Sequence, residues 1–203
     1  MNKKLIYVAM SILSLFFSSC ASNRLGRTPP KTELSLRAKI PSTTIIDKGI
    51  KNSVQLTRFF YDNNPTADQK KVARLAQFYV TECAVEGINS DIAFCQMCLE
   101  TGFLRFGGLV VEEMNNFCGL GAIDENQRGC IFETELIGVR AHVQHLKGYG
   151  TTTPLVTKPV DTRYKWINPK GKAPDIFGLS GTWAADPEYG NKLNMLLQRL
   201  ANY

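Results

Sequence analysis

A chain of 203 residues, with 44% hydrophobic and 21% charged residues, has the composition of one packed domain with an appendage. This composition excludes a wholly disordered chain and a collagen-like repeat. The formal net charge is +6, to which Lys3 and Lys4 contribute two. Such a mildly basic balance favours polyanions but does not indicate nucleic acid, and no nucleic-acid partner is expected.

Residues 1–19 are predicted to form a secretory signal peptide. Lys3 and Lys4 give it a positive start, and residues 5–17 are thirteen in number and predominantly apolar. A helix of that length, at ~1.5 Å per residue, is shorter than the ~30 Å hydrocarbon core, so a permanent span is not expected. Cys20 follows two small residues, as in the lipobox of bacterial lipoproteins, which predicts lipid attachment at Cys20. The alternative is a signal peptide that is cleaved without lipidation.

Residues 20–42 are predicted to be a basic tether between a lipid anchor and a folded domain. From residue 21 to 42, five basic residues stand against one acid, Glu33, and three prolines favour an extended chain. We therefore expect a protein of the bacterial cell envelope that is attached to a membrane through its N-terminal lipid and faces the periplasm. Ala21, rather than an aspartate, follows Cys20, which favours the outer over the inner membrane by analogy with other lipoproteins.

Residues 43–203 are predicted to form a single, mostly helical domain. Apolar residues recur at helical spacing after a start signal at Thr66, and Gly87 marks the end of that helix. Further helices are predicted over about 89–106 and 134–147, and from Asp186 towards the C-terminus. The Gly-rich stretch 115–132 has room for a small hairpin around 124–126. The expected fold class is α+β, dominated by helices.

Glu100 is the first candidate catalytic residue because apolar residues surround it on all sides of its predicted helix. Burial disfavours the charged form of a carboxylate and raises its pKa, which is the condition that a general acid needs. Gly102 lowers helix propensity and lets another chain approach closely. The alternative interpretation is a structural glutamate whose charge is satisfied by Arg105 or by a backbone amide.

Several sequence blocks, taken together, resemble a known family. Residues 96–108 read Gln-Met-Cys-Leu-Glu-Thr-Gly-Phe-Leu-Arg-Phe-Gly-Gly, and residues 115–121 read Asn-Asn-Phe-Cys-Gly-Leu-Gly. Further blocks are 138–146, 160–163 and 183–190. In this order they resemble glycoside hydrolase family 73, the bacterial peptidoglycan β-N-acetylglucosaminidases, which are classed with mannosyl-glycoprotein endo-β-N-acetylglucosaminidase-like domains. The resemblance covers nearly all of residues 50–203.

The resemblance implies a lysozyme-like fold, in which a helical lobe and a small β-lobe flank a groove for a glycan strand. It implies hydrolysis of the β-1,4 bond that follows N-acetylglucosamine in peptidoglycan, with Glu100 as the general acid and no cofactor. The alternative function is that of a non-catalytic lipoprotein that binds peptidoglycan through a degenerate site, because no second carboxylate falls in a matching block.

The second catalytic group has two candidate identities. Most glycosidases use a pair of carboxylates, so Asp124 or Glu125 could position the attacking water. Alternatively, the 2-acetamido oxygen of the substrate attacks the anomeric carbon while Glu100 protonates the leaving oxygen. In that account a tyrosine hydroxyl, from Tyr189 or Tyr164, would steady the developing positive charge, although Tyr189 could equally be a core residue.

Four further residues are candidate substrate ligands. Gln96 lies one turn before Glu100, Asn115 and Asn116 carry amides that suit sugar hydroxyls and acetamido groups, and Trp183 offers a flat face to a sugar ring. The asparagines are as readily interpreted as turn formers, and Trp183 as a residue of the core.

Cysteines and histidines do not predict a metal site. Cys95 and Cys98 have a zinc-like spacing but fall inside a predicted helix rather than in a turn, so no metal is expected. On the helical wheel of the third predicted helix, His145 faces solvent, whereas His142 can reach a neighbouring element.

Five cysteines remain after Cys20, an odd number, so not all can pair within the chain. A bridge between Cys118 and Cys130 is the simplest pairing in an exported domain. Buried free thiols are the alternative.

Overall fold

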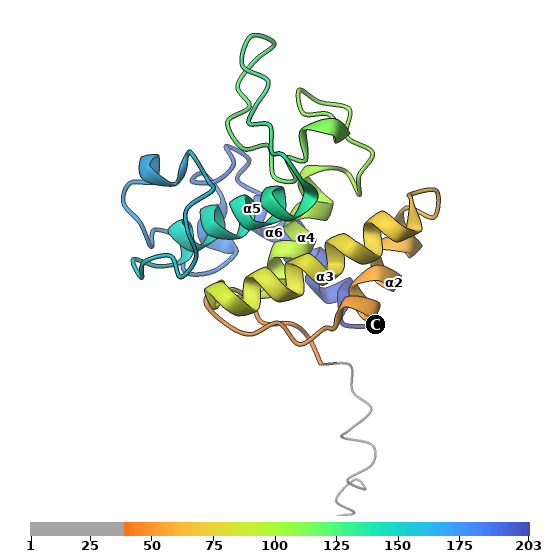
Figure 1. The fold of residues 1–203 in the computed structure, drawn as a ribbon. Coiled ribbons are helices and arrows are strands. Elements are labelled where there is room, and N and C mark those ends of the chain that lie inside the picture. The colour runs from red at the N-terminus through yellow and green to blue at the C-terminus, as the bar shows by residue number, and fades with distance from the viewer. Residues whose placement is uncertain (1–38) are drawn as a thin grey trace, which may run out of the picture. The chain divides into compact units, whose positions relative to one another are not determined.

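The structure is a computed structural model and describes residues 39–203 (Figure 1). The predicted signal peptide, the predicted lipid-attachment residue Cys20 and nearly all of the predicted tether lie outside the described residues. Within 39–203, no helix is long and apolar enough to span a bilayer.

The described part of the chain is mostly helical, as predicted. Its α-helices are α2 (Ser53–Asn63), α3 (Gln69–Glu86), α4 (Ser90–Glu100), α5 (Glu135–Gly150) and α6 (Tyr189–Leu200). Short 3-10 helices are η1 (Glu112–Met114), η2 (Tyr164–Trp166) and η3 (Phe177–Leu179). In these residues β structure is limited to isolated bridges, so the predicted β-lobe is a lobe of loops. The predicted hairpin is a tight turn closed by the bridge between Asp124 and Gln127.

Helix α4 forms the centre of the domain. Ser90–Cys98 are all buried, as the apolar residues on every side of this helix predict. The helix ends at Glu100 rather than near Phe106, because the backbone turns through the left-handed region at Gly102 and at the three residues Phe103, Leu104 and Phe106. This early end places Glu100 where the core meets the loops.

Other predicted helix boundaries are displaced by local hydrogen bonds. Helix α3 begins after Asp68, whose side chain accepts from the backbone N–H groups of Lys70 and Lys71, and not at Thr66. Helix α6 begins after Glu188, because the Asp186 carboxylate accepts from the backbone N–H of Glu188 and closes a separate turn.

Two long loops lie beside the helices. The first loop, residues 101–134, follows α4, and the second loop, residues 151–188, follows α5. Figure 1 shows the first loop, in green, extending from one end of the helices, and the second, in blue, near it. Gly138 of α5 packs directly on the first loop, because a Cβ placed at Gly138 would lie 1.8 Å from the carbonyl oxygen of Asn115. Substituting any larger residue at Gly138 would therefore displace the first loop.

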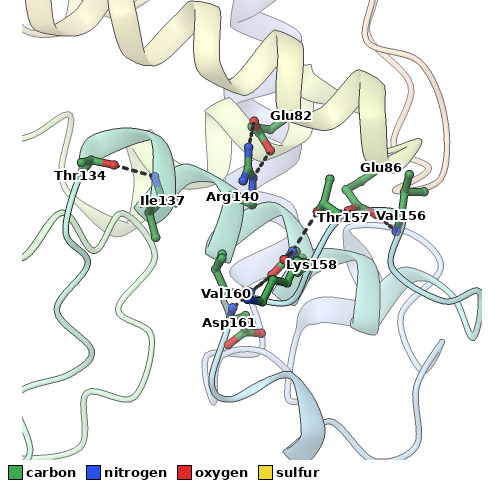
Figure 2. Close-up of polar contacts among 11 residues, drawn as sticks. Glu82, Glu86, Thr134, Ile137, Arg140, Val156, Thr157, Lys158, Val160 and Asp161 are labelled. Carbon is green, nitrogen blue, oxygen red and sulfur yellow. Dashed lines mark hydrogen bonds and ion pairs between the residues drawn. The ribbon is translucent and has the colours of Figure 1, made fainter.

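Acidic residues of α3 fasten α5 and the second loop (Figure 2). The Glu82 carboxylate accepts from the Arg140 guanidinium at 2.8 and 2.9 Å. The Glu86 carboxylate accepts from Lys147 Nζ at 2.8 Å and from the backbone N–H groups of Val156 and Thr157 at 2.9 Å. Burial opposes ionisation of Glu86, but these hydrogen bonds outweigh it and lower its pKa to about 2.

Gln144 of α5 continues this attachment along the second loop. Its amide nitrogen donates to Thr157 Oγ1 and to the carbonyl of Lys158, both at 3.0 Å. Its amide oxygen accepts from the backbone N–H groups of Val160 and Asp161 (Figure 2). The loop is thereby held against α5 up to Asp161, which lies next to the site described below.

Candidate active site

Glu100 is held at the C-terminal end of α4 by two donors from the end of the chain. Its Oε1 accepts a hydrogen bond from Trp183 Nε1 at 2.8 Å and another from the hydroxyl of Tyr189. Its Oε2 takes no hydrogen bond from the described residues and lies near Gly119, where a Cβ would be 3.9 Å away. Burial raises the pKa of Glu100, while the hydrogen bonds from Tyr189 and Trp183 oppose that rise. Glu100 therefore keeps its proton to a higher pH than an ordinary glutamate.

A chain of buried hydrogen bonds leads to Glu100 from α3. Tyr79 Oη lies 2.8 Å from His142 Nδ1, and His142 Nε2 lies 3.0 Å from Gln96 Oε1. Gln96 Nε2 donates to Tyr189 Oη at 2.9 Å, and Tyr189 donates to Glu100. Burial lowers the pKa of His142 to about 3, so its ring is neutral, and the acceptor Oε1 places the proton on Nε2. Every donor in the chain then points towards Glu100.

Two cavities meet beside Glu100. The smaller, of about 200 Å³, is lined by Glu100, by Asn116 and by uncharged residues of the loop after α4. The larger, of about 310 Å³, is lined by Trp183 and by residues of α5 and of the second loop. Gly119 and Ala122 line both cavities. Glu100 and its donor Trp183 thus lie one in each of two adjoining cavities, an arrangement suited to an extended ligand.

His145 lines the larger cavity, where its ring is hydrogen-bonded to Asp161. Its Nδ1 lies 2.7 Å from Asp161 Oδ2, and its ring packs 5.2 Å from that of Trp183. The prediction that His145 faces solvent is wrong, because the second loop folds back over this side of α5 and leaves the side chain 13% exposed. Because Asp161 occupies Nδ1, Nε2 is the ring nitrogen that is left for the cavity. The sequence carried one hint of this contact: Asp161, the partner of His145, lies in the block 160–163 that resembles the family.

Of the candidate substrate ligands, Trp183 lines a cavity beside Glu100, whereas Gln96 does not. Trp183 lines the larger cavity and also packs against the core. Gln96 is 0% exposed and lines neither cavity, so its prediction as a substrate ligand is wrong. It is buried because α4 is covered on all sides, and its amide reaches the site through Tyr189.

The asparagine amides hold the first loop together. Asn115 Nδ2 donates to the carbonyl of Phe132 at 3.0 Å, and Asn115 lines neither of the two cavities. Asn116 lines the smaller cavity, but its Nδ2 donates to the carbonyls of Leu120 and Cys130, and its Oδ1 accepts from the N–H of Leu120. These contacts agree with the interpretation of Asn115 and Asn116 as turn formers, because their amides bond to the loop backbone.

Asp124 and Glu125 are exposed and line neither cavity. The Asp124 carboxylate accepts from the backbone N–H groups of Asn126 and Gln127 at 2.8 and 3.0 Å, which closes its own turn. Among the residues that line the two cavities, Glu100 supplies the one carboxylate. The structure thus does not bring either predicted partner to Glu100.

All five cysteines of the described part are free thiols. The predicted bridge between Cys118 and Cys130 is not formed; Cys130 Sγ lies instead 3.7 Å from Thr162 Oγ1. Over residues 39–203, no three or more His, Cys, Asp or Glu side chains are grouped so as to hold a metal ion. The nitrogens of His142 are already engaged by Tyr79 and Gln96.

The domain is thus mostly helical, with one half-buried carboxyl beside two adjoining cavities. Residues 76–202 match the glucosaminidase family, described as mannosyl-glycoprotein endo-beta-N-acetylglucosaminidase. The chain belongs to this family, as its sequence blocks indicated.

Two individual proteins are similar to the chain. An uncharacterized protein of Borreliella burgdorferi is 35% identical over 203 residues, which are 100% of this chain and 97% of the relative. Among solved structures, Staphylococcus aureus autolysin E in complex with the muropeptide NAM-L-Ala-D-iGlu has 11% identity and a TM-score of 0.48. That match covers 84% of this chain and 77% of the other.

Proposed function

We propose that this domain hydrolyses the β-1,4 bond that follows N-acetylglucosamine in peptidoglycan, with Glu100 as the general acid. Membership of the glucosaminidase family supports the reaction class. The observation that carries the assignment to Glu100 is the state of its carboxyl: one oxygen is fixed by Trp183 and Tyr189, and burial raises its pKa. A group of this kind can hold a proton near neutral pH and deliver it.

The two oxygens of Glu100 have different tasks in this proposal. Oε1 accepts two hydrogen bonds and therefore bears the negative charge once the proton has left. Oε2, free of hydrogen bonds from the described residues, carries the proton and passes it to the glycosidic oxygen as the bond from that oxygen to C1 breaks. Trp183 and Tyr189 thus stabilise the carboxylate that proton transfer leaves behind.

We assign the nucleophile to the substrate, because no second carboxylate lines the cavities beside Glu100. The carbonyl oxygen of the 2-acetamido group attacks C1 and forms an oxazolinium ring as the leaving sugar takes the proton from Glu100. Water then attacks C1, the ring reopens, and the Glu100 carboxylate takes a proton from the water. Two displacements at C1 give net retention of configuration.

The release of new reducing ends from purified peptidoglycan tests the function. Glu100→Gln should lower this release by about 10²-fold or more, because a positioned general acid contributes on that order. Glu113→Gln, an exposed position that lines neither cavity, is the matched control and should leave the rate unchanged. If the wild-type protein sediments with peptidoglycan but releases no reducing ends, the chain is a non-catalytic binding protein instead.

The anomer that is formed first tests the nucleophile. Proton NMR of the fresh product should show the β-anomer, and Asp124→Asn and Glu125→Gln should retain most of the activity. An initial α-anomer would mean inversion, which requires a water activated by a carboxylate and would return Asp124 and Glu125 to the site.

We also propose that the protein is a lipoprotein of the cell envelope, on the basis of the apolar stretch at 5–17 and the following Cys20. Cys20→Ser should abolish incorporation of labelled palmitate and release the protein from the membrane fraction. Labelling that survives this substitution would contradict the anchor while leaving the hydrolase proposal unaffected.

A further inference from the structure

Positive charge gathers on one side of Glu100. The larger cavity is lined by Arg163 and Lys172, and no carboxylate lines it. The histidine in its wall, His145, is already hydrogen-bonded to the Asp161 carboxylate behind it. The smaller cavity has no charged lining residue other than Glu100 itself. The segment 163–172 carries four basic residues and no acid. The two cavities therefore offer a ligand opposite environments, one cationic and one neutral.

The basic residues of 163–172 are not neutralised by ion pairs within the described part of the chain. Three of them lie over aromatic rings: Lys165 Nζ is 5.1 Å from the centroid of Trp166, and Lys170 Nζ is 4.5 Å from that of Tyr164. Lys172 Nζ is 4.5 Å from the ring centroid of Tyr149. Lys170 Nζ also donates to the carbonyl of Tyr164 at 3.4 Å. A ring face positions an ammonium group while leaving N–H donors free, so Lys172, which lines the cavity, can still donate to an anion.

Lys172 is linked to Glu100 by a continuous series of contacts. Lys172 lies over Tyr149, whose ring is 5.1 Å from that of Trp183, and Trp183 donates to Glu100. A sugar in the larger cavity would therefore lie next to the glycosidic oxygen that Glu100 would protonate.

Arg163 lies beside the first loop, whereas Lys172 lies beside α5. The Cδ of Arg163 would be 3.8 Å from a Cβ placed at Gly121, which adjoins the wall shared by the two cavities. Arg163 and Lys172 thus line the same cavity but pack on different elements. Two cations without a carboxylate between them favour an anionic group, and a guanidinium binds a carboxylate in a directed manner.

We propose that the larger cavity selects the acidic sugar of the glycan strand by its carboxylate, and that the smaller cavity receives the neutral N-acetylglucosamine. This inference rests on the proposed function. In peptidoglycan a neutral amino sugar alternates with one that bears a lactyl carboxylate or a peptide stem with carboxylates of its own. The difference in charge across Glu100 then fixes the direction of the strand, and with it which of the two alternating bonds is cleaved. Arg163 and Lys172 are the specificity-determining residues.

The test compares an anionic with a neutral substrate. The variant combines Arg163→Gln with Lys172→Gln, and the substrates are soluble peptidoglycan strands and chitooligosaccharides of similar length. With peptidoglycan, kcat/KM should fall by about tenfold or more, mainly through KM, because two charge-assisted contacts are lost. The ratio of kcat/KM for peptidoglycan to that for chitooligosaccharide should fall by the same factor.

Lys158→Gln is the matched control, since Lys158 is exposed on the same loop and lines neither cavity. It should leave the substrate ratio unchanged. Wild-type enzyme acting on peptidoglycan whose carboxyls have been converted to amides should lose the same factor as the double variant. Thermal unfolding verifies that the double variant is folded. An equal loss on both substrates, or no loss on either, overturns the proposal.

A second measurement keeps the proposal testable if the wild-type protein hydrolyses neither substrate. Calorimetry on the Glu100→Gln protein then compares a disaccharide-peptide of peptidoglycan with its carboxamide form. Tighter binding of the carboxylate form, lost in a triple variant that adds the two substitutions, supports charge selection even though the hydrolase proposal has failed. Equal affinity for the two forms overturns it.

Discussion

The indole nitrogen of Trp183 donates to Oε1 of Glu100 at 2.8 Å, although 83 residues separate the two in the chain. The same indole ring forms part of the wall of the larger cavity. One side chain therefore combines two tasks: it stabilises the ionised form of the candidate acid and lines the space where a sugar would lie. Removing the N–H while keeping an aromatic ring separates these tasks.

Trp183→Phe should raise the pKa of Glu100 further, because the indole donor favours the charged carboxylate. A general acid loses activity as the pH rises through its pKa, so the alkaline limb of kcat/KM should move to higher pH. The pH profile of reducing-end release measures this shift. Trp166→Phe, in a residue that lines the same cavity without bonding Glu100, should leave the limb in place. A limb that moves to lower pH contradicts the assignment.

Tyr189→Phe should destabilise the fold as well as the site. The hydroxyl accepts from buried Gln96 and donates to Glu100, so its loss leaves an amide donor without a partner. We expect the free energy of unfolding to fall by about 1–3 kcal/mol, the cost of an unsatisfied buried polar group. Urea denaturation measures it. Tyr61→Phe is the control, since that hydroxyl makes one long bond of 3.4 Å to the carbonyl of Ala67. Equal stability of the two variants would contradict the buried series of hydrogen bonds from Tyr79 to Glu100.

His142 should make the fold less stable in acid. Burial lowers its folded pKa to about 3, below the unfolded value near 6.5, so between these values the unfolded chain binds more protons. Stability then declines as the pH falls from about 6.5 towards 3, by at most about 1.4 kcal/mol per unit from this group. His142→Gln lowers stability at pH 7 by breaking buried hydrogen bonds, and its difference from wild type should narrow as the pH falls. A difference that is constant across this range would mean that His142 is protonated equally in both states.

Glu86→Gln should loosen the second loop. The substitution leaves Lys147, which is 3% exposed, without its counter-charge, and breaking a buried pair costs about 3–5 kcal/mol. Proteolysis within residues 151–161 and the melting temperature report the change. Glu112→Gln breaks a surface ion pair with Lys71 and should cost less than about 1 kcal/mol.

The Glu86 effect should also depend on pH in a defined direction. The folded pKa, lowered to about 2, lies below the ordinary value of 4.5, so its contribution is complete above about pH 4.5 and is lost as the pH falls towards 2. The stability difference between wild type and Glu86→Gln should shrink over that window. If the difference grows instead, the carboxylate is not the stabilising form.

The spacing of apolar residues predicted those features, such as helix position and burial, that depend on residues close together in the sequence. The apolar residues around α4 predicted its burial, and the predicted starts of α4 near residue 89 and of α5 near residue 134 agree with the N-caps at Asn89 and Thr134. Pattern failed at the end of α4, where left-handed turns stop the helix at Glu100, and at His145, which a remote loop covers. A helical wheel treats one helix in isolation, so it cannot show that a loop from elsewhere in the sequence covers one of its faces.

The sequence by itself determined the helical class, the family and the choice of Glu100 as the candidate acid, because spacing of three or four residues and short blocks record these directly. The tertiary structure decided what surrounds that carboxyl: Tyr189 and Trp183 donate to it, Asp124 and Glu125 line neither cavity, and Arg163 and Lys172 line the larger one. The proton affinity of a carboxyl depends on groups within a few ångströms in space, and the fold brings Trp183 and Tyr189 to Glu100 from more than eighty residues away in the chain.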